Sequence, residues 1–233
     1  MGEPGTTFGR VAAAYARTRP RYAREPIERA AAALGLTADA TVLDLGAGTG
    51  NLTRTLREVF ATVLAVEPDD GMRAHLDGEA LAGTAEAIPL GDGAVDAVFV
   101  GEAFHWFDFQ RALAEISRVG RALAVLARSW GETEQPGLLP TPFKAELDTV
   151  WARFHRPSRE FPDWRDVVRP EGPERFVELV RISGRDLVDL HLTASTPASI
   201  PDEEREAIAA RAYPLMDDAY DLRVVTELYW KRL

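Results

Sequence analysis

A glycine-rich loop between a short apolar strand and a helix constrains this chain more than any other feature. Residues 41–45 (Thr-Val-Leu-Asp-Leu) form an apolar run with one acid, and Gly46-Ala-Gly-Thr-Gly50 follows directly. Glycine reaches positive φ without strain and lets a ligand approach the backbone, while the helix behind it presents free amides and a positive dipole end. Asn51 stands where a dinucleotide fingerprint has its third glycine. Taken alone, the loop predicts only that some nucleotide binds.

Short apolar runs alternate with helical stretches after residue 40, a pattern typical of βα units and a mainly parallel sheet. Strands are expected at residues 41–45, 62–66, 95–100, 122–127, 186–193 and 224–230, with a weak one near 80–83. Helices are expected at residues 51–60, 70–76, 110–119, 143–154 and from 201 onward. The last two strands predict a closing hairpin of the same sheet rather than a second domain.

Length and composition favour one α/β domain over all 233 residues, because the chain is short for two domains. Residues 130–173 break the alternation of strands and helices and are rich in Pro, Trp and Phe. Long insertions of this kind are usually functional, so we expect this one to shape a pocket. There is no cysteine, which excludes disulfides and thiolate chemistry. The histidines are not spaced as metal ligands, and no metal is predicted.

Charge and hydropathy limit the kinds of partner that this chain is expected to bind. The net charge of −10 argues against a nucleic-acid substrate, and no apolar run approaches the length that spans a bilayer. The first residues lack a secretory signal pattern, so a cytoplasmic location is expected. Five arginines nevertheless cluster near the start, at positions 10, 17, 19, 21 and 24. They are either a solvated helix face or a basic lid over an anionic substrate.

Three features accompany the glycine loop. Asp44 is an acid inside an apolar strand, and it needs either a ligand or the amides of the loop to satisfy it. Glu67 ends the second strand, where an acid can accept both ribose hydroxyls of a nucleoside. Residues 84–89 and 91–93 add polar and backbone groups at the same edge of the sheet. Singly, Asp44 could be a loop cap and Glu67 a surface acid, but the combination favours a ligand site.

The sequence resembles the class I S-adenosylmethionine (SAM)-dependent methyltransferases, in particular methyltransferases of type 11 that act on small molecules. The resemblance rests on Asp44-Leu-Gly-Ala-Gly-Thr-Gly50, Ala65-Val-Glu-Pro-Asp69, Ala85-Glu-Ala-Ile-Pro89 and Gly101-Glu-Ala-Phe-His-Trp-Phe-Asp108. It implies a Rossmann-like α/β fold, with a seven-stranded, mainly parallel sheet flanked by helices and an antiparallel last strand. It also implies that residues 1–36 form a helical lid.

The same resemblance assigns roles to residues near SAM. The glycine loop would lie under the methionine portion, Glu67 would hold the ribose, and residues 85–86 would meet the adenine. Residues 102–104 would form the wall near the sulfonium. The cofactor-binding set expected on this basis is Asp44, Gly46, Ala47, Gly48, Gly50, Glu67, Pro68, Ala85, Glu86, Glu102, Ala103 and Phe104.

The sequence says less about the residues that would bind the methyl acceptor. His105 is a candidate general base, because an unperturbed imidazole pKa near 6.5 suits proton removal at neutral pH; alternatively it is a structural plug. The expected lid and substrate residues are Tyr15, Arg19, Tyr22, His105, Trp106, Arg128 and Trp130, with His155 and Arg156 as further candidates. A small molecule methylated on O, N or C is expected, and the arginines favour a carboxylate. S-adenosylhomocysteine would be the product.

Two alternatives to a methyltransferase remain at this point. One is a SAM- or nucleotide-binding regulatory module without transfer activity, which an open or filled site would favour. The other is an NAD-dependent oxidoreductase, which Asn51 at the third-glycine position disfavours. The identity of the acceptor and the choice between monomer and homodimer stay undecided.

Overall fold

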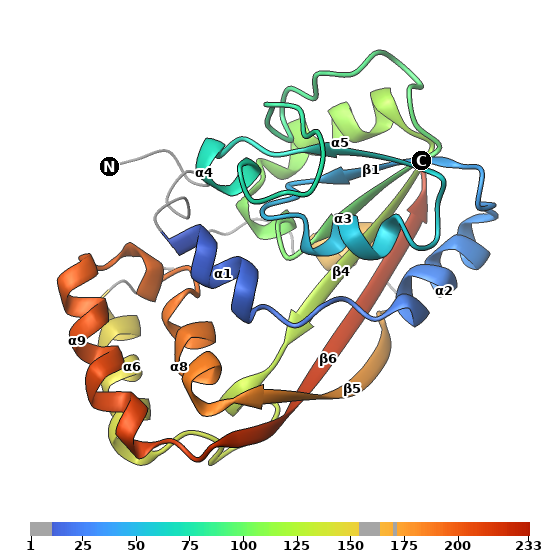
Figure 1. The fold of residues 1–233 in the computed structure, drawn as a ribbon. Coiled ribbons are helices and arrows are strands. Elements are labelled where there is room, and N and C mark those ends of the chain that lie inside the picture. Colours follow the sequence, from blue (N-terminus) through green and yellow to red (C-terminus); the bar gives the residue numbers. More distant parts are fainter. Residues whose placement is uncertain (1–10, 154–163, 170–171) are drawn as a thin grey trace.

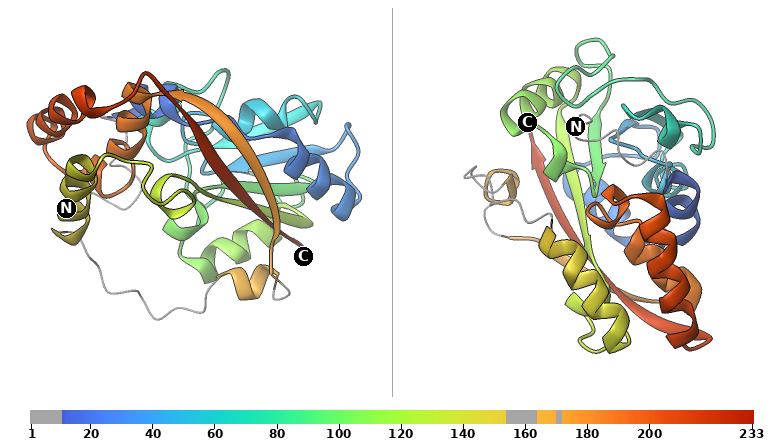
Figure 2. Two further views of the ribbon diagram at one scale, coloured as in Figure 1. Left: turned by 90° about the horizontal axis from the view of Figure 1, so that it is seen from below. Right: turned by 90° about the vertical axis from the view of Figure 1, so that its left-hand side faces the viewer.

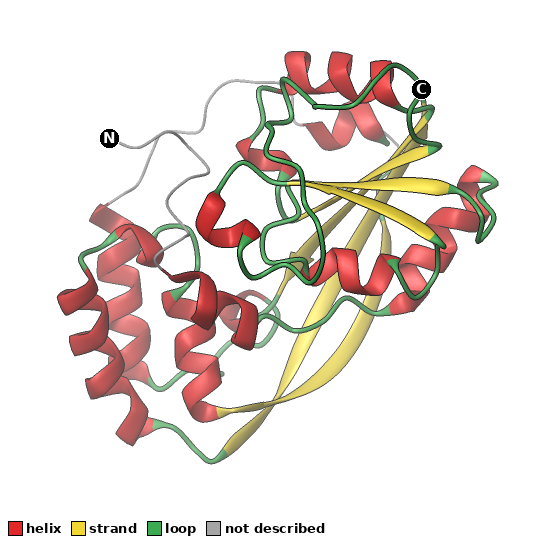
Figure 3. Cartoon of the chain, turned by 45° about the horizontal axis from the view of Figure 1, so that its top comes forward, coloured by secondary structure: helices red, strands yellow, loops and turns green. Residues whose placement is uncertain are grey.

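A single mixed sheet of six strands organises the chain (Figures 1 and 3). The structure is a computed structural model and describes residues 11–153, 164–169 and 172–233. The strands are β1 (Thr41–Leu45), β2 (Thr62–Val66), β3 (Ala97–Gly101), β4 (Ala122–Ser129), β5 (Glu174–Ser183) and β6 (Ala219–Arg232). Their order is β2-β1-β3-β4-β6-β5. The first four strands are parallel to one another, and β6 runs antiparallel to both β4 and β5.

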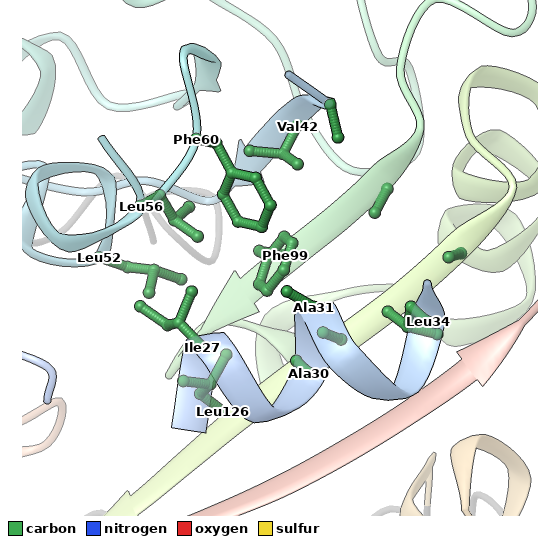
Figure 4. Packing of buried hydrophobic residues seen from close by; sticks show 14 of the residues in the cluster. Ile27, Ala30, Ala31, Leu34, Val42, Leu52, Leu56, Phe60, Phe99 and Leu126 are labelled. Carbon is green, nitrogen blue, oxygen red and sulfur yellow. The ribbon is translucent and has the colours of Figure 1, made fainter. Parts of the chain in front are cut away.

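Helices cover both faces of the parallel part of the sheet. The helices are α1 (Ala12–Thr18), α2 (Arg24–Leu34), α3 (Asn51–Leu56), α4 (Asp70–Arg73), α5 (Phe109–Val119), α6 (Thr141–Arg153), α7 (Trp164–Val168), α8 (Gly184–Leu192) and α9 (Asp202–Ala212). Figure 4 shows one face, where Ile27 of α2 and Leu56 of α3 pack with Phe99 of β3. On the other face, Ile116 of α5 packs against Val98 and Val100 of the same strand.

A helical group formed by α6, α8 and α9 sits at one end of the sheet, beside the far ends of β5 and β6 (Figures 1 and 2). It has its own apolar core, in which Phe143 of α6, Leu190 of α8 and Ile208 of α9 are buried with Leu222 and Val224 of β6. The N-terminal helix α1 contacts α8. The helical group is therefore joined to the N-terminal segment as well as to the sheet.

The expected strand at residues 186–193 is wrong, because this segment is helix α8. Ser183 caps it by accepting the amide of Asp186 (3.1 Å), and its apolar residues enter the core of the helical group. The sheet strand is β5, just upstream, where burial alternates residue by residue. A short apolar run can be either element, and the cap together with the tertiary contacts decided for helix. The expected closing hairpin is nevertheless present, formed by β5 and β6.

The sheet has six strands where seven were expected, since residues 80–83 do not form a strand. Leu81 alone pairs with Val66, through its amide to Ala65 O (2.9 Å) and its carbonyl from the Glu67 amide (3.1 Å). Glycines lie on both sides, and a Cβ at Gly83 would stand 2.6 Å from Pro89 Cδ. The segment therefore leaves the edge of the sheet after the single bridge between Leu81 and Val66.

The other expected strands lie where the sequence placed them, with shifts at their ends, as do the helices α3, α5, α6 and α9. Within the segment 130–173 the structure describes α6, α7 and the single-turn 3-10 helix η3 (Gly131–Thr133). The candidate residues His155 and Arg156 lie outside the described residues. No helix in the described ranges has the length and hydropathy needed to cross a membrane.

Candidate functional site

A cavity of about 290 Å³ opens at the carboxyl ends of β1 to β4. One part, which we call the loop side, is lined by residues of the segments 44–49, 67–72 and 83–86. The other part, the lid side, is lined by Tyr15, Arg19, Tyr22, Arg128, Trp130, Ala194 and Ser195. The end of β3 and the segment after it also line the cavity, through Gly101, Glu102, Ala103, His105, Trp106 and Phe107; we count this segment with neither side. Open α/β sheets bind ligands at this edge.

Most of the residues predicted for the site line this one cavity. They are Asp44, Gly46, Ala47, Gly48, Glu67, Pro68, Ala85, Glu86, Glu102, Ala103, His105, Trp106, Tyr15, Arg19, Tyr22, Arg128 and Trp130. Gly50 and Phe104 do not line it.

The glycine loop adopts the conformation that its sequence predicts. Gly46, Gly48 and Gly50 all have positive φ, at 72°, 56° and 78°. A Cβ on Gly46 would lie 2.6 Å from Ala103 Cβ, so glycine is required there for the loop to approach the end of β3. Gly50 instead closes the turn by donating its amide to Ala47 O (2.9 Å), and a Cβ there would meet Leu76 of the core. Its contribution to the site is indirect.

Glu67 holds the loop side together. Its buried carboxylate accepts the Gly48 amide on one oxygen and the Asp69 amide on the other, both at 2.9 Å. Burial raises the pKa of Glu67, and these two amides oppose that rise. Asp69 in turn caps α4 by accepting the Met72 amide (3.0 Å), as the sequence predicts. The carboxylate of Glu67 is thus held in place by two backbone amides, one from the glycine loop and one from the start of α4.

Asp44 is an acid with one oxygen unsatisfied. Its Oδ2 accepts the Thr53 hydroxyl (2.5 Å), while Oδ1 is buried without a hydrogen-bond partner among the described residues. Burial raises the pKa of Asp44 to about 7, with the Thr53 bond acting in the opposite direction. A buried acceptor without a donor is costly. The free oxygen therefore leaves a place for a donor from a ligand in the cavity.

The end of β3 carries a strained residue. Glu102 has a φ of 54°, and its carboxylate Oε1 accepts the backbone amide of Arg128 from β4. Burial raises the pKa of Glu102, and Arg128 and Arg19 lower it. Phe104, two residues later, is buried beneath the wall, where its ring lies 5.4 Å from Phe107. Phe104 does not line the cavity, because its ring belongs to the core on the α5 face.

A hydrogen bond connects the segment 83–86 of the loop side to the residues at the mouth of the cavity. Glu86 Oε1 accepts the Asp108 amide (2.8 Å), which ties the segment after residue 83 to the start of α5. His105 lies in the single-turn 3-10 helix η2 (Phe104–Trp106), with its ring 5.0 Å from that of Trp106. Partial desolvation at the mouth of the cavity, and secondly the positive charge of Arg165, lower the pKa of His105, although the residue keeps an exposed surface. A neutral imidazole at neutral pH follows from this direction.

The lid side is assembled from both ends of the chain. Arg19 follows α1 and donates to the carbonyls of Leu190 (3.2 Å) and Thr193 (3.1 Å), at the C-terminal end of α8. A cation is favoured at that end of a helix, where carbonyls are free and the dipole is negative. Arg17 pairs with two carboxylates of α8, Asp186 and Asp189. These contacts hold α1 against the helical group.

Arg128 is a buried cation that is only partly satisfied. Its Nη1 donates to Pro20 O (2.9 Å), and its guanidinium lies 4.4 Å from the ring centre of Tyr22. Nε and Nη2 are buried and have no hydrogen-bond partner in the part of the chain that the structure describes. The positive charge of Arg128 also lowers the pKa of Glu178 in β5, against the larger rise caused by burial. The Oε1 atom of Glu178 is likewise buried without a partner among the described residues. The guanidiniums of Arg128 and Arg19 lie 5.5 Å and 5.0 Å from the ring centre of Trp130.

Several lining residues were not predicted. Asn51 lines the cavity and donates its side-chain amide to Pro20 O (2.8 Å), the carbonyl that Arg128 also contacts. Its place directly after the glycine loop could have indicated it. Ala194 and Ser195 also line the cavity, but neither residue carries a local signal in the sequence. They reach the site only because Arg19 docks on the end of α8.

The sheet and the cavity at its carboxyl edge are typical of the Rossmann-like α/β class, and comparison with known proteins shows what the chain is similar to. A family model described as a methyltransferase domain matches residues 43–127. An uncharacterized methyltransferase of Mycobacterium tuberculosis is 45% identical over 134 residues, which cover 55% of this chain and 54% of that protein. A malonyl-[acyl-carrier protein] O-methyltransferase of Pectobacterium atrosepticum is 33% identical over 153 residues, covering 63% of this chain and 57% of that protein.

A solved structure shares the fold. It is a putative type II methyltransferase from Anaeromyxobacter dehalogenans, with a TM-score of 0.57 and 22% identity, covering 92% of this chain and 97% of that one. The chain spans about half the length of the curated relatives it matches. Over residues 43–127 the chain is similar to methyltransferases, and it shares the fold of a solved one.

Proposed function

We propose that the protein transfers a methyl group from SAM to a small-molecule acceptor, with S-adenosylhomocysteine as the second product. The observation that carries the proposal is the single cavity in which the glycine loop and Glu67 share a space with the lid side. Bound on the loop side, SAM supplies an electrophilic methyl group on its sulfonium. Methyl transfer depends on positioning more than on a nucleophilic side chain, and a shared cavity provides that positioning.

The loop side suits the cofactor for two reasons. Gly46 and Gly48 leave room for a ligand against the backbone, and the Oδ1 atom of Asp44 offers an acceptor that the described residues leave unused. Glu67 sits at the end of β2, where an acid can take ribose hydroxyls. Its two amide contacts leave lone pairs on both oxygens, because a carboxylate has about four acceptor sites.

The lid side favours an enzyme over a regulatory module. Arg19 is seated on the end of α8, and Tyr15, Tyr22 and Trp130 form an aromatic wall around a hollow space. A module that only senses SAM needs no second compartment next to the sulfonium. Since the cavity is neither filled by side chains nor a flat open surface, its shape supports transfer to an acceptor.

An anionic acceptor is the finer part of the proposal. Nε and Nη2 of Arg128 form one edge of the planar guanidinium, the edge that can bind a carboxylate through two parallel bonds. Both atoms lack partners, so pairing them with a carboxylate would remove an unfavourable burial. The malonyl-[acyl-carrier protein] relative is named as an O-methyltransferase, which supports an oxygen atom as the methyl acceptor.

Calorimetry with SAM, S-adenosylhomocysteine and NAD tests the cofactor. We expect micromolar or tighter binding of both sulfur nucleotides and no binding of NAD. A transfer assay with methyl-labelled SAM and a metabolite extract then tests the activity, and mass spectrometry identifies the product. Binding without any transfer of label would favour the regulatory module, and binding of NAD in place of SAM would contradict the proposal.

A further inference from the structure

Glu102 occupies a backbone conformation that its side chain disfavours. It is the one non-glycine residue in the described ranges with positive φ, at 54°. Non-glycine residues persist in this region only where the surrounding structure enforces it, and they cluster at ligand sites. A glycine at position 102 would relieve the strain. The carboxylate is therefore present at a cost in free energy, and a role for it must be sought in its surroundings.

Only half of the carboxylate is used by the protein. Oε1 accepts the Arg128 amide, whereas no hydrogen bond to Oε2 is found among the described residues. Glu102 is half-buried and lines the cavity between the loop side and the lid side. Because the Arg128 amide fixes one oxygen at the edge of the sheet, the other oxygen is oriented as well.

Three cations act on this carboxylate. They are Arg128, Arg19 and Arg165, and the first two line the same cavity. Both of these guanidiniums also lie close to the ring of Trp130. Glu102 is the one carboxylate on this part of the cavity wall, since Asp44, Glu67 and Glu86 belong to the loop side. A ligand on the lid side therefore meets an anion and two cations within one small space.

We propose that Glu102 is an acceptor-binding residue that accepts a hydrogen bond from a hydroxyl or amine of the acceptor, while Arg128 holds the anionic group of the same molecule. The acceptor class is then a small hydroxy acid or amino acid, rather than a simple carboxylate or a simple amine. This inference rests on the proposed function, because it concerns the second ligand of the same cavity. Hydrogen-bond complementarity of this kind discriminates strongly, since an analogue that lacks the donor covers the carboxylate oxygen and leaves it unpaired.

The competing use of Glu102 is to hold SAM itself, whose methionine end carries an ammonium and a carboxylate. The two uses differ in the ligand whose affinity changes when the charge is removed. Glu102→Gln keeps an oxygen that can accept the Arg128 amide and removes the charge. Glu102→Gly relieves the strain and removes the whole group. Glu28→Gln, on the exposed face of α2, is the matched control.

The experiment has two readouts for each variant: the Kd of S-adenosylhomocysteine from calorimetry, and the KM of the acceptor identified from a metabolite extract with methyl-labelled SAM. For the wild type, we expect labelled products that carry an anionic group together with a hydroxyl or amine, free or methylated. For Glu102→Gln, we expect an unchanged Kd and an acceptor KM raised about tenfold or more, the effect of losing one hydrogen bond to a charged group. Glu28→Gln should leave both values unchanged.

Glu102→Gly separates recognition from a structural role. We expect its Tm to rise, because the strain is relieved, while its acceptor KM rises as much as in Glu102→Gln. A fall in Tm together with an unchanged KM would overturn the proposal, as would a tenfold loss of S-adenosylhomocysteine affinity in Glu102→Gln. Products without a hydroxyl or amine group would also overturn it. Failure of the wild type to bind S-adenosylhomocysteine is a different result, which contradicts the proposed function itself.

Discussion

The loop side and the lid side of the cavity are built in different ways. On the loop side, Glu67 and the amide of Gly48 are 19 residues apart in the chain, and both follow strands of the same parallel sheet. On the lid side, Arg19 reaches carbonyls of α8 that are 171 and 174 residues away. Strand ends and loop conformation therefore place the loop side, whereas the docking of distant helices places the lid side.

The two sides also differ in how their polar groups are satisfied. Glu67 has backbone donors on both carboxylate oxygens, and Asp44 has one of its two oxygens bonded. On the lid side, Nε of Arg19 and two nitrogens of Arg128 are buried without partners among the described residues. A site that binds an invariant cofactor can be satisfied largely by its own backbone. A site for a specific second ligand keeps unused donors, which that ligand must pair.

The largest expected effect is at His105, in the segment between the two sides. If it is the general base, His105→Ala should lower kcat by about 10²–10⁴-fold. Because the pKa of His105 is lowered from 6.5, its imidazole is neutral above pH 6.5 and becomes protonated only at lower pH. The loss of kcat in His105→Ala should therefore be complete above pH 6.5 and should shrink as the pH falls. The measurement is a pH profile of kcat, with the exposed His75→Ala as control. A loss that is greater at low pH than at high pH would contradict the base role.

Asp44 should make the free protein less stable as the pH rises. Its folded pKa is raised from 3.8 to about 7, so between these values the folded state binds a proton that the unfolded state has released. The free energy of unfolding should therefore fall from pH 4 to pH 7, by about 4 kcal/mol from this residue. Asp44→Asn should remove that part of the slope, as measured by urea unfolding at pH 5 and pH 8. Asp39→Asn, on an exposed turn, should keep it.

Gly46→Ala tests whether the loop side depends on close backbone approach. Positive φ costs an alanine about 1–2 kcal/mol, and the contact with Ala103 adds about 1–3 kcal/mol of overpacking. Gly93→Ala is a matched control, because Gly93 has a φ of 63° and nothing within 4 Å of its added Cβ. Both variants should lose stability, while only Gly46→Ala should lose SAM affinity in calorimetry. Equal affinity in the two variants would remove Gly46 from the site.

Glu67→Ala should weaken SAM binding by about 1.5–3 kcal/mol, through the loss of hydrogen bonds to a charged acceptor. Glu67→Gln keeps one acceptor oxygen and should lie between the alanine variant and the wild type. Glu58→Ala, whose carboxylate pairs with Arg21 at the surface, is the control for calorimetry. If the affinity of Glu67→Ala equalled that of the wild type, the amide contacts of Glu67 would be its whole role.

The smallest expected effect is at the contact of α1 with α8. Arg17 pairs with Asp186 and Asp189, but its side chain is 53% exposed. Exposed ion pairs contribute about 0–1 kcal/mol and are screened by salt. Arg17→Ala should therefore lower the free energy of unfolding by no more than this, and the difference should vanish at high salt. A loss of several kcal/mol would mean that the lid side is held together electrostatically, unlike the loop side.

Local patterns in the sequence account for most of the sheet and the loop side. The run from Asp44 to Gly50 needs positive φ at three glycines, and these residues adopt it. Asp69 caps α4, and Glu67 lies at the end of β2 beside the loop. Each of these outcomes depends on neighbours within a few residues or on parallel strands that share one edge. Sequence spacing therefore carries enough information to predict them.

The lid side and the helical group needed the tertiary structure. The segment 186–193 is helical because Ser183 caps it and its apolar residues enter a core formed with α6 and α9. Ala194 and Ser195 join the cavity through the same docking, and Phe104 leaves it because its ring completes the core beneath. Short apolar runs and single polar residues take their role from what packs against them. Contacts between residues more than a hundred positions apart leave no periodicity in the chain from which they could be read.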